Sequence, residues 1–371
     1  MTDISRRNLF AAGAAGAAGL AAGAAVGTAT TAAAQGARPA AKGMVTRAGL
    51  PNVWGEEFLS QWSPPENYKR DTTPGPNTIR LSGQTTPRMS NAEGTDYASI
   101  LKQMHDGGWS ATEVPSDAWM RRGKMPESEI RLIKDQLKAN DIVLYGMHCA
   151  GNIIAPDPDA DRWQRHIVDT IHAADEMGCE LILTHTGSMY PNRNIAHPQN
   201  WSKESWDRSV NALKRICKDT AGVKIDIAIE PVNTEVINNP WAMKRLREDV
   251  GDERITCGLD ITNMIDPSVA FRMSELIDTT FDLLREQIRY VHAKDVAWNG
   301  MLACLNWTMN GTGLMDYELY LAQISRLTRT KTPYMLIEFL SANEEYDQAQ
   351  RNVRAIANKI GVKIHGTQRA A

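Results

Sequence analysis

The chain has 371 residues, and its 41 lysines and arginines against 44 aspartates and glutamates give it a formal net charge of −3. It has no basic run, which is the electrostatic signature of nucleic-acid binding, so we expect no nucleic-acid partner. The five cysteines are odd in number, widely spaced and free of any CxxC pair, which argues against both a disulfide framework and a zinc ribbon.

The first 34 residues have the composition of a targeting segment rather than of a fold. Arg6 and Arg7 in "SRRNLF" precede a mildly apolar Ala/Gly-rich stretch that ends at Ala32-Ala33-Ala34, a small-residue cleavage pattern. The segment looks like a twin-arginine export signal, which the export machinery reads and which is then removed. The alternative is an Ala/Gly-rich disordered tail. We therefore expect a bacterial protein that folds in the cytoplasm and is periplasmic or secreted.

No other segment approaches the ~18 apolar residues of a membrane span, so we expect the mature protein to have no membrane partner. About 337 residues remain after the signal, enough for one large α/β domain. Residues 35–76 are rich in Pro, Gly, Asn and Trp and show no sustained period. We interpret them as an irregular N-terminal arm laid over the domain.

From residue 77 to 362, a short β-branched run, a polar loop and an amphipathic helix recur along the chain, as in βα units. The expected strands lie at residues 77–83, 109–116, 141–149, 179–187, 223–233, 255–263, 288–295 and 334–340. The expected helices include residues 161–178, 204–222 and 348–361, the last ending in a glycine suited to a helix stop. Eight units predict an α/β fold, the single-domain (β/α)8 TIM barrel, followed by a tail at 363–371. The alternative is a doubly wound open sheet, but no GxGxxG follows the first strand.

Four of the expected strands end in residues of the kind that ligate metals: Glu230, Asp260, His292 and Glu338. Alternate residues of a strand face opposite sides, so these carboxylates can face inward while their bulky neighbours face the helices. Three carboxylates buried together are very unfavourable without a compensating cation. Any one of the four alone fits a salt bridge or a core side chain, but their joint occurrence on consecutive strands favours a metal site. The donor set suits one divalent ion, Mn²⁺ first and Mg²⁺ or Co²⁺ as alternatives, better than a structural zinc.

Over roughly residues 76–362 the chain resembles the xylose-isomerase-like sugar isomerases and epimerases. The resemblance is carried by "IAIEPVN", "CGLDITNM", "YVHAKD", "NGTGLMDY" and "MLIEFL". It implies that Glu230, Asp260, His292 and Glu338 hold one divalent metal. It also implies that the two glutamates serve as acid and base. Many members carry a histidine where this chain has Asn263, which we treat as a candidate substrate contact.

In this family a hydroxy-ketone or aldehyde loses the proton beside its carbonyl, and the divalent ion stabilises the charge of the resulting enediolate. The resemblance thus implies a divalent-metal-dependent isomerase or epimerase acting on a free sugar or glycoside. We assign Glu230 and Glu338 dual roles as ligands and acid/base groups, and Lys294 the role of polarising a substrate oxygen. The same intermediate expels a leaving group on the β carbon. The alternative is therefore a lyase or hydratase that cleaves 3-keto-glycosides by β-elimination.

Two histidines at other strand ends, His148 and His185, are candidates for contacting substrate hydroxyls. We assign to His185 the further role of a separate proton carrier. The alternative for each is a hydrogen bond to a loop carbonyl. Trp119 and Trp298 lie near the expected mouth of the barrel, where an indole face can stack on a sugar. Trp307 also lies near this mouth. The alternative for all three tryptophans is loop packing, and it weighs most for Trp307.

Two further function classes stay open. A metal-dependent DNA-repair endonuclease on the same barrel would need several metals, more histidines and a basic surface. A non-catalytic sugar-binding protein would have no need of acid and base carboxylates. Barrels of this kind often form homo-oligomers, but the sequence shows no interface signature strong enough to name one.

Overall fold

The computed structural model describes residues 69–83, 95–117, 125–265, 269–270, 272–298 and 305–366. The predicted export signal, residues 35–68 of the predicted arm, and Trp119 lie outside this part. Residues 69–76 contain no helix or strand, and Arg70 among them pairs with Asp316 and Glu318 at 2.5 and 2.8 Å. Within the described ranges, no helix combines the length and hydropathy needed to cross a bilayer.

Eight parallel strands of the described chain form a closed sheet, and each corresponds to a strand predicted from the sequence. They are β1 (Thr78–Gly83), β2 (Ala111–Pro115), β3 (Val143–His148), β4 (Leu181–Thr184), β5 (Asp226–Ile229), β6 (Ile255–Leu259), β7 (Ile288–Ala293) and β10 (Tyr334–Ile337). From β2 to β10 each pairs with the next in this order, and β10 also pairs with β1. Between β1 and β2, the backbone N–H of Ser110 donates to the carbonyl of Leu81 at 3.1 Å. Because the first and last strands are neighbours, the predicted barrel is confirmed and the open doubly wound sheet is excluded.

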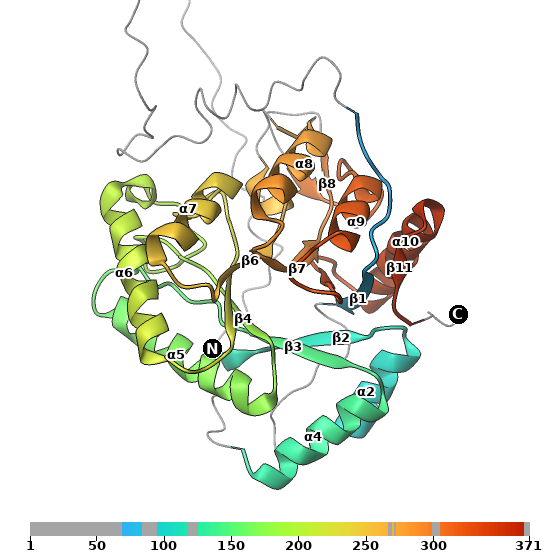
Figure 1. Ribbon diagram of the computed structural model, residues 1–371, viewed down its shortest axis with the longest axis horizontal. Helices are drawn as coiled ribbons and strands as arrows, with labels where there is room; N and C mark the ends of the chain where they lie inside the picture. Colours follow the sequence, from blue (N-terminus) through green and yellow to red (C-terminus); the bar gives the residue numbers. More distant parts are fainter. Residues whose placement is uncertain are drawn as a thin grey trace, which may run out of the picture. The chain divides into compact units, whose positions relative to one another are not determined.

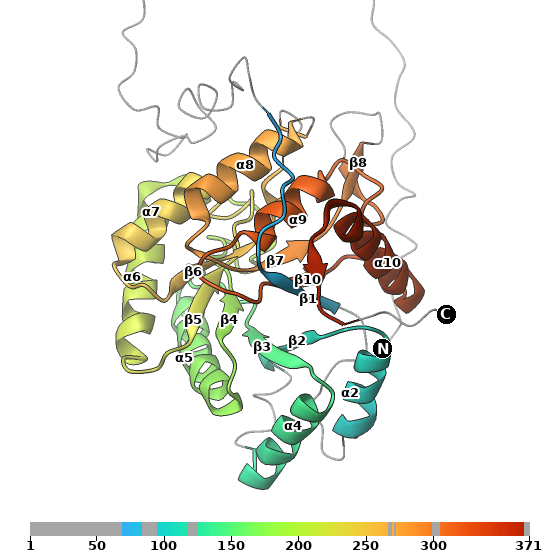
Figure 2. The same cartoon turned by 45° about the vertical axis from the view of Figure 1, so that its right-hand side comes forward.

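A helix follows each barrel strand and packs outside it, so the strands lie within a ring of helices (Figure 1, Figure 2). The helices are α2 (Tyr97–Asp106), α4 (Glu127–Ala139), α5 (Asp159–Met177), α6 (Lys203–Asp219), α7 (Pro240–Val250), α8 (Met273–Leu284), α9 (Tyr317–Ser325) and α10 (Asn343–Ile360). The three helices predicted explicitly correspond to α5, α6 and α10. As predicted, α10 stops at Gly361, whose φ of 80° is the left-handed geometry that glycine adopts without strain.

The side chains inside the barrel come from alternate positions of its strands. One apolar cluster fills this interior: Ala111, Tyr145, Leu181, Leu183, Ala228, Tyr290 and Tyr334. The residues between them, such as Ile182, Ile227 and Met335, belong to the larger core beneath the helices. Tyr290 fits because Gly258 on the neighbouring strand has no side chain; a Cβ there would lie 2.6 Å from the tyrosine ring.

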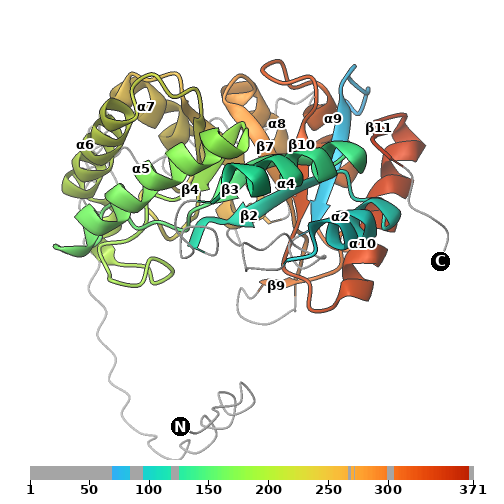
Figure 3. The same cartoon turned by 90° about the horizontal axis from the view of Figure 1, so that it is seen from below.

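Short strands also form where the sequence predicted none. In the segment after β7, interpreted from the sequence as a long loop, β8 (Val296–Trp298) and β9 (Leu305–Trp307) form an antiparallel hairpin. Figure 3 shows β9 apart from the barrel strands. In the segment predicted as a tail, β11 (Lys363–Ile364) pairs in parallel with β1. Both pairings join residues that carry little strand pattern of their own, so local sequence gives no signal for them.

Charged residues connect the strands at their N-terminal ends. The guanidinium of Arg289 lies 2.7 Å from Asp226 and 3.1 Å from Glu180. The Tyr334 hydroxyl donates to Glu180 at 2.5 Å, and Arg329 pairs with Asp226 at 3.2 Å. In a barrel of this type the N-terminal end serves stability, so function is to be sought at the other end.

Candidate functional site

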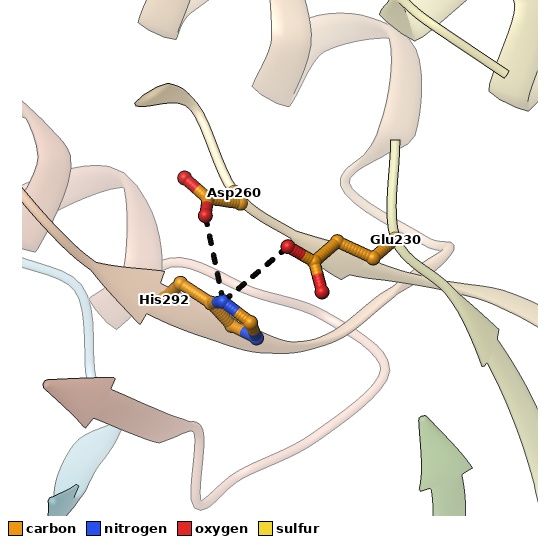
Figure 4. A group of neighbouring side chains, drawn as sticks. All are labelled: Glu230, Asp260 and His292. Atoms are coloured by element: carbon orange, nitrogen blue, oxygen red, sulfur yellow. Dashed lines mark ion pairs between the residues drawn. The ribbon is translucent and has the colours of Figure 1, made fainter. Parts of the chain in front are cut away.

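The four predicted ligands meet at the C-terminal ends of their strands. Glu230 follows β5, Asp260 follows β6, His292 lies near the end of β7, and Glu338 follows β10; all four are at most 4 % exposed. Figure 4 shows the imidazole of His292 turned towards the carboxylates of Glu230 and Asp260. Its Nδ1 lies 3.6 Å from Glu230 Oε1 and 3.5 Å from Asp260 Oδ2. The same nitrogen lies 3.1 Å from Glu338 Oε2.

This arrangement fits a bound cation. Single donor atoms of Glu230, Asp260 and His292 lie within 4.8 Å of one another, and the described residues contain no second group of this kind. Nδ1 of His292 is buried and makes no hydrogen bond of normal geometry, although carboxylates surround it. Glu338 is not one of the three; its carboxylate lies between His292 and Lys294. Three of the four predicted ligands therefore form the group, and the fourth adjoins it.

Hydrogen bonds around the group fix the orientation of its members. The hydroxyl of Tyr290 lies 2.9 Å from Nε2 of His292, so Nδ1 is the nitrogen that faces the carboxylates. Oδ1 of Asp260 accepts hydrogen bonds from the backbone N–H and the hydroxyl of Thr262, at 2.9 and 2.6 Å. Asn263, predicted as a substrate contact, donates to Glu230 Oε1 at 2.5 Å. In the structure, then, Asn263 positions a candidate ligand.

Lys294 brings a positive charge into the group. Its Nζ lies 2.5 Å from Asp260 Oδ2, 2.8 Å from Glu338 Oε2 and 4.0 Å from Glu230 Oε1. Burial raises the pKa of Glu230. Burial also acts to raise the pKa values of Asp260 and Glu338, but the cationic neighbours Lys294 and His292 outweigh it, and both pKa values lie below the usual one. A histidine that binds metal is neutral, and in that state three carboxylates against the one ammonium of Lys294 leave two negative charges, which one divalent cation would balance.

A second polar group adjoins the first next to β4. Nε2 of His185 lies 3.5 Å from Glu230 Oε2, and its Nδ1 lies 3.5 Å from Glu235 Oε1. Glu235 accepts from the backbone N–H of Gly187 at 2.7 Å and pairs with Arg193 at 3.2 Å. Burial raises the pKa of Glu235 to about 7 and holds the pKa of His185 well below its usual value. His185 therefore lies between two carboxylates, not against a loop carbonyl.

His148 also faces a carboxylate. Its Nδ1 lies 3.6 Å from Oε1 of Glu113 on β2, and the Tyr145 hydroxyl donates to Oε2 of that glutamate at 3.2 Å. The rings of His148 and His185 are 6.0 Å apart. The sequence reasoning overlooked Glu113 and Glu235. Glu113 lies inside the apolar run "ATEVP", and Glu235 lies in the loop that begins at Glu230. These two placements are the sequence signals that could have identified them.

Two exposed aromatic rings border the group. Trp307 on β9 is 46 % exposed and Phe339, which follows Glu338, is 49 % exposed, yet their ring centroids are only 4.8 Å apart. The Nζ of Lys294 lies 4.2 Å from the centroid of Phe339 and 5.6 Å from that of Trp307. The interpretation of Trp307 as loop packing is therefore incomplete, because the indole reaches a charged residue of the site. Trp298, predicted to contact substrate, lies partly buried on β8 of the same hairpin.

A model of the family described as xylose isomerase-like TIM barrel matches residues 101–359 of the chain. No curated protein matches it.

Solved structures match at low sequence identity. A probable 3-DHS dehydratase from Bacillus anthracis is 15 % identical, with a TM-score of 0.58 over 76 % of this chain and 100 % of its own. D-psicose 3-epimerase from Clostridium cellulolyticum H10 is 14 % identical, with a TM-score of 0.56 over 76 % and 100 % of the two chains. The IolI protein with a bound zinc atom is 13 % identical, with a TM-score of 0.56 over 76 % and 98 %. At such identities these structures establish the shared fold alone.

Proposed function

The chain belongs to the xylose isomerase-like TIM barrel family, and from this premise we propose that it is a divalent-metal-dependent sugar isomerase or epimerase. The observation that carries the proposal is the buried Nδ1 of His292, which faces the carboxylates of Glu230, Asp260 and Glu338 at 3.6, 3.5 and 3.1 Å. The substrate is a free sugar or a glycoside with a hydroxyl beside a carbonyl. A site with several carboxylates and a lysine serves proton transfer, which a protein that only binds sugar does not need.

We assign the metal to Glu230, Asp260 and His292, with Glu338 as the adjoining fourth donor. When bound, a divalent ion polarises the substrate carbonyl and stabilises the negative charge that develops on its oxygen. The oxygen-rich donor set favours Mn²⁺, with Mg²⁺ and Co²⁺ as alternatives. Zinc, present in one structural neighbour, belongs among the ions tested.

The proton transfers fall to the side chains of the chain itself. One of the two glutamates, Glu230 or Glu338, takes the proton from the carbon beside the carbonyl and leaves an enediolate. Lys294, with Nζ 2.8 Å from Glu338, donates a hydrogen bond to the oxygen that becomes charged. Return of the proton to the opposite face of the same carbon gives an epimer, and return to the neighbouring carbon gives an isomer.

The alternative is β-elimination from a 3-keto-glycoside, and the position of His185 favours it. In this reaction a carboxylate removes the proton from C2, the C1–O bond to the aglycone breaks, and the departing oxygen takes a proton from a second acid. His185 lies between Glu230 and Glu235 at 3.5 Å from each, and Glu235, whose pKa burial raises to about 7, can supply the proton that a neutral His185 passes to the departing oxygen. One structural neighbour is described as a probable dehydratase, and loss of water is likewise an elimination.

Export is part of the proposal. The paired arginines at residues 6 and 7 would send the folded protein through the twin-arginine machinery, so that it acts in the periplasm or outside the cell. Free sugars and glycosides are the carbohydrates that such an enzyme meets there.

Solvent exchange tests the function. The protein is stripped of metal, reloaded with Mn²⁺, Mg²⁺, Co²⁺ or Zn²⁺, and incubated in D₂O with free ketoses and with 3-keto-glycosides. After removal of paramagnetic ions, NMR should show metal-dependent deuterium beside a carbonyl. Release of the aglycone decides for elimination, and an epimeric or isomeric product decides for the first function. Bound metal without exchange on any of these sugars would refute both.

A further inference from the structure

We propose that Trp307 and Phe339 form a subsite for an aromatic aglycone, so that the substrate is an aryl glycoside whose sugar ring lies over the candidate metal group. This inference rests on the proposed function, because it names the substrate class of the same site. We call the two rings, together with the hairpin face that carries Trp307, the aromatic wall.

The first observation is that two aromatic rings are exposed beside the candidate metal group. Large aromatic side chains are normally covered, and a folded protein that leaves two of them about half exposed and in contact marks a binding surface. Trp307 and Phe339 are 46 % and 49 % exposed, with centroids 4.8 Å apart and planes tilted by 31°. Both rings lie within 6 Å of Lys294 Nζ, which itself contacts Asp260 and Glu338. A ligand on the wall therefore lies beside the reacting groups.

The second observation is backbone strain at one of these rings. Phe339 has a φ of 63°, the left-handed region that a bulky side chain rarely adopts. Such a conformation is unfavourable and is held by its surroundings mainly at functional positions. It comes directly after Glu338, and it turns the ring towards Trp307 rather than into the core.

The third observation is the pattern of the hairpin. In an antiparallel pair, opposite residues share a face, and so do residues two apart in one strand. Val296 pairs with Trp307 and Trp298 pairs with Leu305, so these four side chains occupy one face. That face contains two indoles and two aliphatic side chains, and Val296 on it is 4 % exposed. Val296 and Leu305 pack with the core, so this face anchors the hairpin and leaves Trp307 exposed at its outer edge, where it meets Phe339.

The composition of the wall selects the kind of ring that it binds. A second sugar ring has hydroxyls around its rim, and these lose affinity unless hydrogen-bond partners meet them. The wall offers hydrocarbon and aromatic faces, and the ammonium of Lys294 lies against Asp260 and Glu338 and gives its remaining hydrogen bond to the reacting oxygen of the sugar. A planar aromatic ring stacks on such faces without needing polar partners. An aryl group on the glycosidic oxygen is therefore the occupant that fits.

Binding of matched probes to the full chain tests the subsite. Phenyl β-glucoside, methyl β-glucoside and cellobiose are titrated into the Mn²⁺-loaded protein by calorimetry, with tryptophan fluorescence as a second readout. We expect phenyl β-glucoside to bind about tenfold more tightly than the methyl compound. Trp307→Ala and Phe339→Gly should each bring that ratio close to one, while Trp307→Phe should keep most of it. Trp163→Ala, which removes an indole from α5, is the matched control and should leave the ratio unchanged.

Three outcomes overturn the subsite. The first is a phenyl-to-methyl affinity ratio near one in the wild type. The second is an affinity ratio that Trp307→Ala does not change. The third is that cellobiose binds as much more tightly than methyl β-glucoside as phenyl β-glucoside does. Phe339→Gly also relaxes the backbone, so far-ultraviolet circular dichroism and thermal unfolding check that each variant is folded. If the ratio depends on Trp307 but no sugar exchanges deuterium, the subsite stands and the proposed function fails. If ketoses exchange deuterium but phenyl and methyl β-glucoside bind with equal affinity, the proposed function stands and the subsite fails.

Discussion

Tyr290 decides which nitrogen of His292 faces the carboxylates. Its hydroxyl, 2.9 Å from Nε2, occupies one side of the imidazole and leaves Nδ1 towards Glu230 and Asp260. Partners of this kind fix the tautomer and the angle of a ligand without touching the ion. Tyr290 itself depends on Gly258, since a side chain there would collide with its ring. A glycine and a tyrosine on neighbouring strands thus position one candidate ligand atom.

Replacing Tyr290 by phenylalanine should weaken Mn²⁺ binding about tenfold or more, because loss of a partner to a ligating histidine typically lowers metal affinity 10–100-fold. The measurement is the Kd for Mn²⁺ by titration calorimetry. Tyr145→Phe is the matched control, since that buried tyrosine belongs to the same interior cluster but bonds Glu113. Equal Mn²⁺ affinities for Tyr290→Phe and wild type would refute the positioning role.

The raised pKa of Glu235 predicts how the stability of the protein depends on pH. Its pKa in the folded protein is about 7 against 4.5 for an ordinary glutamate, so the folded state holds a proton that the unfolded state has lost between these values. Its contribution to stability is therefore full below pH 4.5 and falls as the pH rises through 7, by about 3 kcal/mol in all. Glu235→Gln has no proton to lose and escapes this decline.

Urea unfolding at pH 5 and pH 8 measures the effect. The stability of wild type minus that of Glu235→Gln should be smaller at pH 8 by about 2–3 kcal/mol. Glu248→Gln, at an exposed position on α7, is the control and should give the same difference at both values. A difference for Glu235→Gln that does not change with pH would contradict the raised pKa.

At the scale of elements, the β8–β9 hairpin depends on the carboxylate of Asp295. That carboxylate accepts from the backbone N–H groups of Val296, Gly311, Gly313 and Met315 at 2.9–3.0 Å. The four bonds join the start of the hairpin to the segment that follows it. They anchor β8, which pairs with the strand that carries Trp307, although no barrel strand of the described residues pairs with either.

Gly313→Ala should loosen the hairpin. A Cβ at this position would lie 2.3 Å from the carbonyl oxygen of Val296 and 2.4 Å from Asp295 Oδ1, and neither atom can move freely. Overpacking of this kind destabilises by about 1–3 kcal/mol. We expect faster amide hydrogen exchange in residues 305–315 and a phenyl-to-methyl affinity ratio nearer one. Thr312→Ala, at an exposed neighbouring position, should change neither; unchanged exchange in Gly313→Ala would show that the segment accommodates the methyl group.

At the scale of the whole molecule, the two ends of the barrel divide stability from function. The N-terminal end carries opposite charges that pair with one another around Arg289, Asp226 and Glu180. The C-terminal end carries an excess of carboxylates with one lysine. Removing one partner from a buried ion network leaves an unfavourable charge, so the first network must stay intact, whereas the second has negative charge left over that a bound cation can balance.

Arg289→Ala should destabilise the protein by about 3 kcal/mol, because it leaves the largely buried carboxylate of Asp226 with less compensation. The measurement is denaturant unfolding at pH 7. Lys203→Ala is the control, since it removes an exposed ion pair on α6 whose contribution should stay below about 1 kcal/mol. Similar losses in the two variants would show that the N-terminal network adds nothing to stability.

Binding of a metal ion to the candidate group at the C-terminal end of the barrel should raise the free energy of unfolding of the protein. At a free Mn²⁺ concentration 100 times the Kd, the gain is about 3 kcal/mol, which raises the Tm by about 5–10 °C. Scanning calorimetry with and without Mn²⁺ measures the shift. His292→Ala should abolish it whatever the stability of that variant alone. A metal-dependent shift that survives in His292→Ala would place the ion elsewhere.

Local pattern was enough for the framework of the protein. The eight strands follow from local periodicity, and the stop of α10 follows from Gly361. The meeting of Glu230, Asp260, His292 and Glu338 follows from strand alternation and from the rule that parallel strands bring their carboxyl ends to one side of a barrel. These features need only short-range sequence and a known topology.

Tertiary structure decided the rest, because those contacts join residues whose sequence separation carries no signal. Glu113 meets His148 only once β2 and β3 pair, and Trp307 meets Phe339 only once the hairpin folds over the end of β10. Asn263, whose contact with substrate stays a prediction, donates a hydrogen bond to Glu230 from 33 positions away. Chain order determines which side chains reach the mouth of the barrel, whereas register and packing between distant segments determine which atoms face each other there.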